Sequence, residues 1–354
     1  MSKALRITGA WSVMALVAGA LPLAQPVLAS DQLTITSFGG AGQMATRKGQ
    51  IEPFAKKTGI KITEDEYGGE VSKIRAMVES KSVSWDLVVA DATAASQMCA
   101  EGIIERIDWN KLGLDRAKFV GADQQDCGVP ENLYATVLAY DKDTLPTGPT
   151  TIADLFDLQR FPGKRGLYKR PFGNIEWALI ADGVPIKDVY KVLRTPAGIE
   201  RAFNKLDTIK KNVVWWETGA QAPQLLADRQ VVMTSAWNGR IYDAVKNSGK
   251  HFQIMWHAQE LGLNVWVMPK GGQHLDTAYK FLTFAVSPAQ QAEPTRYMAY
   301  GPANKEANAH VDPAILPDLP SAPDHMAGAL LVDTSFWAEN GDELRQRFTA
   351  WLVK

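Results

Sequence analysis

The sequence predicts an α/β protein made of two lobes that are joined by two crossing strands. Short runs rich in β-branched residues alternate with longer amphipathic stretches, which is typical of largely parallel sheets covered by helices. Two apolar runs, 134–141 and 261–268, lie where the pattern passes from one set of α/β units to another. Two short connections between α/β lobes form a hinge, and the space between the lobes can hold a ligand.

The composition is that of an ordinary globular protein of about two domains. The 354 residues include 38 Lys and Arg against 39 Asp and Glu, a formal net charge of −1, and 46% of the residues are hydrophobic. A charge near zero lacks the electrostatic footprint of a nucleic-acid-binding protein. We therefore expect no nucleic-acid partner. The apolar fraction is normal for a folded protein, and this excludes low-complexity disorder.

The first thirty residues have the three parts of a secretory signal peptide. Lys3 and Arg6 precede an apolar run at 11–23, and small residues follow it. The apolar run is too short for a comfortable membrane span, so we expect cleavage near Ala29-Ser30. An uncleaved amphipathic anchor is the alternative. The mature protein is expected in an exported, water-filled compartment.

The two cysteines, Cys99 and Cys127, predict one disulfide, because an oxidising compartment favours a bonded pair. A catalytic thiol is the alternative, but no His follows either Cys in a recognisable nucleophile setting. The five His residues show no i, i+4 pair, and the chain has no C-x-x-C motif. Because the zinc templates are absent, we expect no metal and no cofactor.

The elements of the first lobe begin at residue 33. The short run Leu33-Thr-Ile-Thr-Ser-Phe38 predicts a strand, and the glycine-rich loop 39–42 separates it from a helix over 43–57. The units that follow are a strand at 60–67, a helix at 71–80, a strand at 85–90 and a helix at 94–100.

A second set of units begins after a long strand at 132–141 and a turn-rich stretch. Thr195 and Pro196 form an N-cap and first-turn pair, which predicts a helix over 197–211. The other units are helical stretches at 154–156, 175–181, 222–229 and 239–247 and strands at 166–169, 213–216 and 231–235.

After the run 261–268 the chain is expected to return to the first lobe, with a helix at 277–285, a Pro-rich stretch and a final helix at about 342–352. The predicted division is a signal peptide at 1–29, a discontinuous lobe 1 at 30–136 and 267–354, and lobe 2 at 137–266.

Six fragments carry a resemblance that covers the whole mature chain. They are Thr36-Ser-Phe-Gly-Gly40, Trp85-Asp-Leu-Val-Val-Ala-Asp91, Phe161-Pro-Gly-Lys164, Ala236-Trp-Asn-Gly-Arg240, Val265-Trp-Val-Met-Pro-Lys270 and Tyr300-Gly-Pro-Ala-Asn304. In this order, and behind a signal peptide, they resemble the extracellular solute-binding proteins of bacterial ABC importers, in the spermidine/putrescine-binding branch.

The resemblance implies the type II periplasmic binding fold, a periplasmic location and an ABC permease in the inner membrane as the partner. Such a protein captures a small solute by closure of its two lobes and delivers it to the permease. The expected solute bears an amine and is either a polyamine such as putrescine or spermidine, or an ω-amino acid such as 4-aminobutyrate. A monomer is the family expectation.

The loop after the first strand supplies three candidate ligand-binding residues, Ser37, Phe38 and Gly39. Ligands of parallel α/β domains sit beyond the carboxyl ends of strands, where loops and helix N-termini offer free N–H groups. A dinucleotide fingerprint is a poor alternative because Gly39-Gly-Ala-Gly42 lacks the G-x-G-x-x-G spacing. A plain tight turn is the other alternative.

Tryptophans beside polar residues at strand ends indicate an ammonium site, since ring faces and a carboxylate together hold an ammonium well. The resemblance places Trp237 at the ligand-facing wall, and it also brings in Tyr300. For Trp266 the sequence leaves two roles open, one in the ligand pocket and one in core packing. Asp91 and Glu217 are the candidate ammonium partners, and a solvated or helix-capping role is the alternative for each.

Departures from the family bear on the ligand. By the resemblance, polyamine binders have acidic residues near the helix that begins here at Asn174 and on the strand that holds Asn264, and this chain has Arg170, Asn174 and Asn264 there. A buried ammonium without a counter-charge is costly, so the case for a polycation weakens. Arg240 is suited to a carboxylate or phosphonate, and a surface ion pair is its alternative role.

Two other functions share these sequence features. An exported enzyme could use Asp91, Glu217 and Arg240 for acid–base chemistry, although the chain has no G-x-S-x-G motif and no metal cluster. A ligand sensor for a membrane receptor is the third possibility. We expect a binding protein and no enzyme activity.

Overall fold

The computed structural model describes residues 32–354, and the predicted signal peptide lies outside the described residues. The strands are β1 (Gln32–Ser37), β2 (Lys61–Glu66), β3 (Leu87–Asp91), β4 (Val129–Asp141), β5 (Arg165–Tyr168), β6 (Val213–Trp216), β7 (Met233–Trp237), β8 (Phe252–Val267), β9 (Gly301–Pro302) and β10 (Leu330–Leu331).

The helices follow the alternation that the sequence predicts. The α-helices are α1 (Gly40–Thr46), α2 (Glu52–Thr58), α3 (Val71–Glu79), α4 (Ala92–Ala100), α5 (Trp109–Leu112), α6 (Asn174–Ala181), α7 (Val189–Leu193), α8 (Pro196–Asp207), α9 (Gln221–Ala227), α10 (Asn238–Ser248), α11 (Leu275–Ala285), α12 (Pro288–Ala292), α13 (Pro323–Met326) and α14 (Thr334–Leu352). A π-helical turn, Arg47–Ile51, joins α1 to α2. The 3₁₀ turns are Arg116–Lys118, Ala122–Gln124, Ile152–Phe156, Ile186–Asp188, Lys210–Asn212, Glu293–Arg296, Ala307–His310 and Leu316–Asp318.

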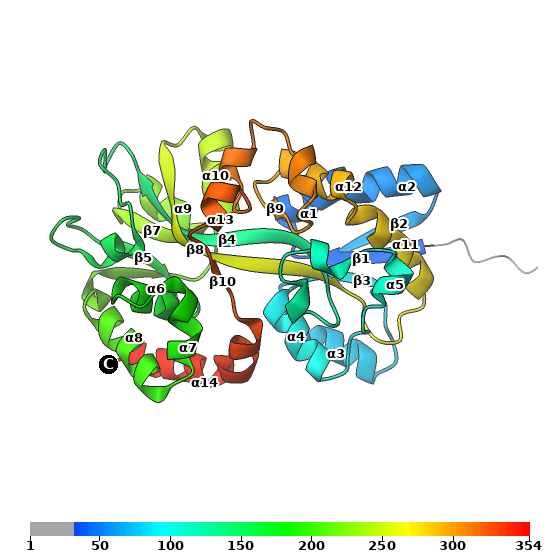
Figure 1. Ribbon diagram of the computed structural model, residues 1–354, viewed down its shortest axis with the longest axis horizontal. Helices are drawn as coiled ribbons and strands as arrows, with labels where there is room; N and C mark the ends of the chain where they lie inside the picture. The colour runs from blue at the N-terminus through cyan, green and yellow to red at the C-terminus, as the bar shows by residue number, and fades with distance from the viewer. Residues whose placement is uncertain (1–31) are drawn as a thin grey trace, which may run out of the picture. The chain divides into compact units, whose positions relative to one another are not determined.

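Two long strands, β4 and β8, hold the described sheet together. The sheet order is β2-β1-β3-β8-β4-β7-β5-β6, and β4 and β8 pair with each other from Val129 opposite Trp266 to Asp141 opposite Phe252. One end of β8 pairs with β3, and the far end of β4 pairs with β7. Figure 1 shows these two strands crossing between the two groups of helices. They are the two crossings that the sequence predicts.

The expectation of a largely parallel sheet is correct for the outer strands and wrong for the centre. The pairs β1–β2, β1–β3, β5–β6 and β5–β7 are parallel, as α/β units require. The pairs β3–β8, β8–β4 and β4–β7 are antiparallel, and each of them includes one of the two crossing strands.

Two predicted boundaries were wrong by several residues. Strand β8 begins at Phe252 and not near 261, and its register against β4 shifts near Thr136 and Leu138. The polar residues His257, Gln259 and Glu260 interrupt the apolar pattern in this part of the strand, and Ala258 takes a left-handed conformation with φ 56°. Helix α14 begins at Thr334 and not near 342, because Asp333 caps it by accepting the N–H of Phe336 at 2.9 Å.

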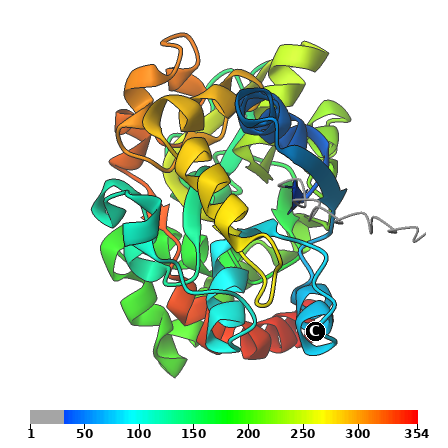
Figure 2. The ribbon, with the colours of Figure 1, turned by 90° about the vertical axis from the view of Figure 1, so that its right-hand side faces the viewer.

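The last helix packs on the second set of units. Phe336, Trp337, Phe348 and other apolar residues of α14 share one buried cluster with α6, α7 and α8. Figures 1 and 2 both show the red C-terminal helix at the lower edge beside green helices. The predicted lobe boundaries stay a prediction, and we propose that residues 330–352 belong to the second lobe.

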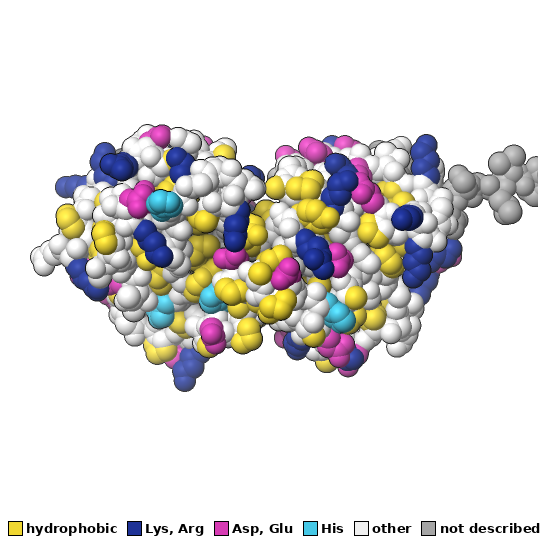
Figure 3. Space-filling model, turned by 90° about the horizontal axis from the view of Figure 1, so that it is seen from above, with side chains coloured by type: hydrophobic (Ala, Val, Ile, Leu, Met, Phe, Trp, Pro, Cys, Tyr) yellow, Lys and Arg dark blue, Asp and Glu magenta, His cyan; other side chains and the backbone are white. Residues whose placement is uncertain are grey.

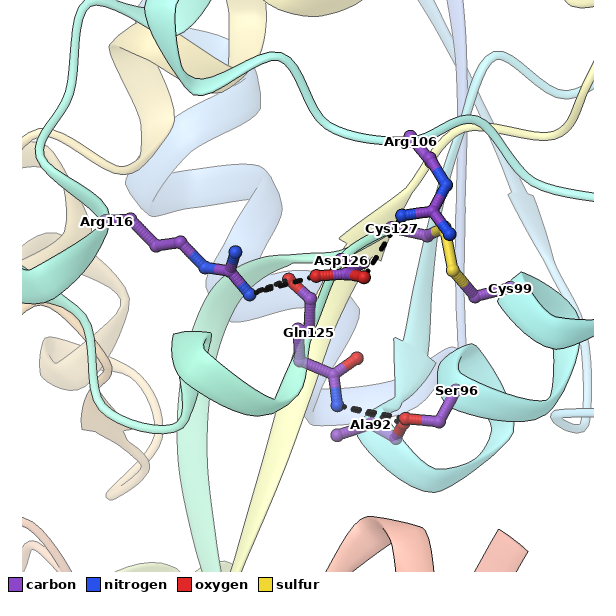
Figure 4. The surroundings of a disulfide bond; sticks show 8 residues. All are labelled: Ala92, Ser96, Cys99, Arg106, Arg116, Gln125, Asp126 and Cys127. Atoms are coloured by element: carbon purple, nitrogen blue, oxygen red, sulfur yellow. Dashed lines mark hydrogen bonds and ion pairs between the residues drawn. A yellow bond between two sulfur atoms is a disulfide. The ribbon is translucent and has the colours of Figure 1, made fainter.

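The predicted disulfide forms between Cys99 and Cys127. It joins the end of α4 to the segment just before β4, with a Cα–Cα distance of 5.7 Å (Figure 4). Next to it, Asp126 pairs with Arg106 at 3.1 Å and with Arg116 at 3.3 Å. These contacts fix the start of a crossing strand to the first set of units. Among the described residues no helix is long and apolar enough to cross a membrane.

Two buried carboxyl groups lie close to the crossing strands. Glu176, in α6, accepts hydrogen bonds from Gly173 N–H at 2.9 Å, Tyr190 O–H at 3.2 Å and Trp337 Nε1–H at 2.9 Å. Glu260, on β8, is 1% exposed, and neither of its oxygens has a hydrogen-bond partner among residues 32–354. Burial raises the pKa of Glu176 to about 7. Burial and the nearby charge of Glu176 raise the pKa of Glu260 well above its usual range.

Removal of the disulfide should destabilise the protein. The bond closes a loop with a sequence separation of 28 residues. By chain entropy alone this contributes about 3–4 kcal/mol to the free energy of unfolding. The double variant C99S/C127S should lose this amount in urea unfolding, and wild-type protein in a reducing agent should match it. An unchanged unfolding midpoint would contradict the assignment.

The substitution Glu260→Met should raise the free energy of unfolding by about 1–3 kcal/mol at pH 8, because it removes two buried oxygens that lack donors. The folded pKa of Glu260 lies above the ordinary value of 4.5. The charge therefore destabilises the fold increasingly as the pH rises above about 4.5, and the gain should be smaller at pH 5.

Thermal unfolding of Glu260→Met at both pH values measures this effect. Glu176→Met is the matched control, because its oxygens accept three hydrogen bonds, and it should destabilise the protein at both pH values. A lower stability of Glu260→Met at pH 8 would show that Glu260 has a stabilising partner.

Candidate ligand-binding site

A cavity of about 840 Å³ lies against the crossing strands and takes its walls from both sets of units. Nine of the ten predicted ligand-binding residues line it, namely Ser37, Phe38, Gly39, Asp91, Asn174, Trp237, Arg240, Asn264 and Tyr300. The tenth, Glu217, does not. Figure 3 shows one face of the molecule, on which hydrophobic side chains gather toward the middle and charges of both signs flank them.

The loop after β1 is shaped by Gly39. This residue has φ 70°, and a Cβ there would lie 2.6 Å from a carboxylate oxygen of Glu66, so only glycine fits without strain. Phe38, which precedes Gly39, is 44% exposed, and its ring stacks on that of Tyr67 with the ring centroids 5.4 Å apart. Phe38 therefore presents an aromatic face at the cavity, as the sequence predicts.

Asp91 ends β3 and caps helix α4. Its Oδ1 accepts the N–H of Thr93 at 2.8 Å, and its Oδ2 accepts the O–H of Tyr134 at 2.8 Å. The helix N-terminus also stabilises a negative charge at this position. The carboxylate is thus compensated before any ligand arrives, although it lines the cavity.

A hydrogen-bonded chain of polar residues crosses the floor of the cavity. Asn264 Nδ2 donates to Asn132 Oδ1 at 3.1 Å, and Asn132 Nδ2 donates to Glu131 Oε2 at 2.8 Å. Thr46 donates to Glu131 Oε1 at 3.2 Å. Glu131 is 3% exposed, and burial raises its pKa to about 7. The sequence did not reveal Glu131, because Val129-Pro-Glu131 carries no motif and the register shift between Pro130 and Asn132, where Glu131 lies, is seen only in the paired strands.

Asn174 shapes the cavity wall. Its Nδ2 donates to the carbonyl oxygens of Tyr168 at 2.7 Å and Arg170 at 2.6 Å, so both amide protons are used. These bonds hold the loop between β5 and α6, where the guanidinium of Arg170 lies over the ring of Tyr168 at 4.2 Å. Asn174 thus fixes the backbone next to Arg170, and it is itself part of the cavity lining.

Aromatic rings form the adjoining wall. Tyr168 stacks on Trp216 with ring centroids 4.2 Å apart, and Trp237 packs edge-on against both at 5.7 and 5.9 Å. Trp237 is half-buried and lines the cavity, while Trp216 is buried behind it. Trp266 is fully buried against Phe281 in the core, so the structure assigns it to packing.

Arg240 has no hydrogen-bond or ion-pair partner among the described residues, and its exposed guanidinium lines the cavity. The surface ion pairs considered for it do not form, because Asp243 accepts a hydrogen bond from Asn247 and Glu217 pairs with Lys169 at 2.7 Å. The side chain of Glu217 is 64% exposed and lies outside the cavity lining. Glu217 therefore does not contribute a counter-charge to this site.

Tyr300 connects the two walls. Its ring lies 6.1 Å from that of Tyr134, and it sits so close to Gly239 that a Cβ there would lie 2.8 Å from its Cε1. Burial raises the pKa of Tyr300 to about 12, and the nearby charge of Arg240 opposes this shift. The phenol is therefore neutral and can donate or accept a hydrogen bond at the cavity.

Comparisons with known proteins identify the family of this chain. The sequence profile of the bacterial extracellular solute-binding proteins matches residues 49–323. A gamma-aminobutyric acid-binding protein of Pseudomonas aeruginosa is 41% identical over 325 residues, which cover 92% of each chain. A spermidine/putrescine-binding periplasmic protein of Salmonella typhimurium is 25% identical over 339 residues, covering 89% of this chain and 90% of the relative.

A solved structure shows the same fold. The ABC transporter substrate-binding protein of Bradyrhizobium japonicum superimposes with a TM-score of 0.84 at 34% identity, covering 91% of this chain and 99% of that one. The predicted type II periplasmic binding fold is thereby confirmed. The chain belongs to the bacterial extracellular solute-binding protein family.

Proposed function

We propose that this protein is the substrate-binding component of an ABC importer and that it captures a small ω-amino acid, with 4-aminobutyrate as the candidate. Family membership supports solute capture, and the 41% identical relative is a gamma-aminobutyric acid-binding protein. We infer a periplasmic location after removal of residues 1–29, a monomeric state, and an inner-membrane permease as the partner.

The observation that carries the choice of ligand is that the carboxyl groups and two of the guanidinium groups of the cavity lining come from different sets of units. The carboxyl groups that line it, Asp91 and Glu131, come from β3 and the first part of β4. Two of its guanidinium groups, Arg170 and Arg240, come from the β5–α6 loop and from α10. A zwitterion lying across the cavity meets an opposite charge at each end.

A polyamine fits this arrangement less well. One ammonium of putrescine could lie near Asp91 or Glu131, but the other would face Arg170 and Arg240. Like charges brought together in a partly desolvated site cost several kcal/mol. The neutral Asn264 and Asn174 supply no further anion to offset this cost, so polyamines are the disfavoured class.

Closure of the lobes is the proposed mechanism. A zwitterion bridging the two walls gains contacts in a closed state that it lacks in an open one, and this difference shifts the population toward the closed state. Asn238 joins the moving parts close to the hinge. Its Oδ1 accepts the N–H of Ala135 on β4 at 3.0 Å, and its Nδ2 donates to the carbonyl of Ala299 at 2.5 Å. The start of α10, which follows Trp237 and holds Arg240, is therefore tied to β4 and to the segment before Tyr300.

The ligand preference can be tested by thermal unfolding of refolded, ligand-free mature protein. A ligand at about one hundred times its Kd stabilises the fold by about 2.7 kcal/mol, a shift of several degrees. We expect this shift with 4-aminobutyrate and a smaller one or none with putrescine and spermidine at the same concentration. A shift with the polyamines alone would contradict the proposal.

Arg240→Met should weaken 4-aminobutyrate binding about 10- to 100-fold, the loss expected for removal of a charged hydrogen-bond donor worth about 1.5–3 kcal/mol. Isothermal titration calorimetry measures the Kd. Arg106→Met is the matched control, because Arg106 pairs with Asp126 outside the cavity lining, and it should leave the Kd unchanged. Equal affinities of Arg240→Met and wild type would show that Arg240 does not hold the carboxylate.

A further inference from the structure

We propose that Glu131 and Gln50 form the ammonium-binding corner of the cavity, in which Glu131 selects for ligands that carry a primary amine. This assignment rests on the proposed function and goes beyond it by naming the residues that hold one end of the ligand. Both side chains line the cavity, and both are almost completely buried, with exposures of 3% for Glu131 and 1% for Gln50.

The corner is built from two separate parts of the chain. Thr46 and Gln50 stand four residues apart in the continuous helical segment of α1 and the π-helical turn that follows it. Residues at this spacing lie on one side of a helix. Thr46 donates to Glu131 of β4 at 3.2 Å, Gln50 follows Thr46 by about one helical turn, and all three side chains line the same cavity.

The corner holds more hydrogen-bond acceptors than donors. Gln50 Nε2 donates to the carbonyl of Ala285 at 3.1 Å, which fixes the orientation of the amide, and Gln50 Oε1 has no partner among the described residues. The Thr46 hydroxyl has one proton for two acceptors, since Glu131 Oε1 and the Gly42 carbonyl both lie 3.2 Å away. A primary ammonium has three N–H donors and no acceptor, so its chemistry is complementary to this corner.

The charge of Glu131 is uncompensated. No Lys, Arg or His among residues 32–354 forms an ion pair with it, and its donors are the neutral side chains of Thr46 and Asn132. Asp91 differs, because it caps α4 and accepts from Tyr134 as well. A buried carboxylate without a counter-charge is unfavourable, and a bound cation removes that penalty.

Proton binding should therefore be linked to ligand binding. Burial raises the pKa of Glu131 to about 7, so part of the ligand-free population carries a proton there at pH 7. The side chains that face it from the neighbouring elements, Thr46, Gln50 and Asn132, do not titrate. Tyr300, with a pKa of about 12, stays neutral although Arg240 lies near it. An ammonium beside Glu131 favours the ionised form and expels the proton.

The test is calorimetric titration of the mature protein with 4-aminobutyrate and with butyrate, which lacks the amine, at pH 7 in two buffers of different ionisation enthalpy. Wild type should bind 4-aminobutyrate far more tightly than butyrate and release protons when it binds 4-aminobutyrate. E131Q should lose about 10- to 100-fold in affinity for 4-aminobutyrate, keep its affinity for butyrate, and release no proton.

Asp91→Asn is the comparison variant, because it neutralises the other carboxyl group that lines the cavity. It should retain the proton release. Loss of the release in Asp91→Asn together with wild-type behaviour of E131Q would overturn the assignment and place the ammonium at Asp91. Gln50→Met, which leaves Glu131 intact, should weaken 4-aminobutyrate about 3- to 10-fold and preserve the proton release, and an unchanged affinity would remove Gln50 from the corner.

Two further results separate this assignment from the proposed function. If wild type bound neither compound, the proposed function would be overturned, and the assignment with it. If wild type bound 4-aminobutyrate and a folded E131Q bound it equally well, only the assignment would be overturned. Thermal unfolding of E131Q checks the fold, and neutralisation of a buried carboxylate should leave its midpoint no lower than that of wild type.

Discussion

The pairing of β4 with β8 is the constraint on which the rest of the structure depends. These two strands pair along most of their length, each takes part in the sheet on both sides of the crossing, and the cavity lies against them. Side chains from β4, such as Glu131 and Tyr134, and from β8, such as Asn264, are thereby held on a common floor. The walls on either side can contribute different chemistry to one site because this floor belongs to both.

The division of charge follows from the same topology. The carboxyl groups of Asp91 and Glu131 lie on strands of the first set of units, and the guanidinium groups of Arg170 and Arg240 lie on the second set. A ligand with one charge of each sign is thus attracted to both walls at once, and its two ends favour closure together. Neither wall alone would distinguish a zwitterion from a simple anion or cation.

The sequence predicted much of the fold and most of the cavity lining. Regular alternation located the parallel strands and their helices, and the fragment that contains Trp237 and Arg240 predicted both as cavity residues. The sequence pattern did not reveal the first half of β8, because polar residues and a left-handed Ala258 interrupt the apolar pattern there. Glu131 was missed because it lies at a register shift in the pairing of β4 with β8, a strand more than a hundred residues away in the chain. Glu217 was predicted in the cavity lining but lies outside it. Its ion pair with Lys169 could not be predicted, because the two residues are far apart in the sequence.

A crystal structure of the mature protein with 4-aminobutyrate would test the account most directly. We expect the two sets of units to close around the ligand, with its carboxylate on Arg240 and its amine beside Glu131 and Gln50. A ligand bound in the opposite orientation, or bound to one wall without closure, would contradict it.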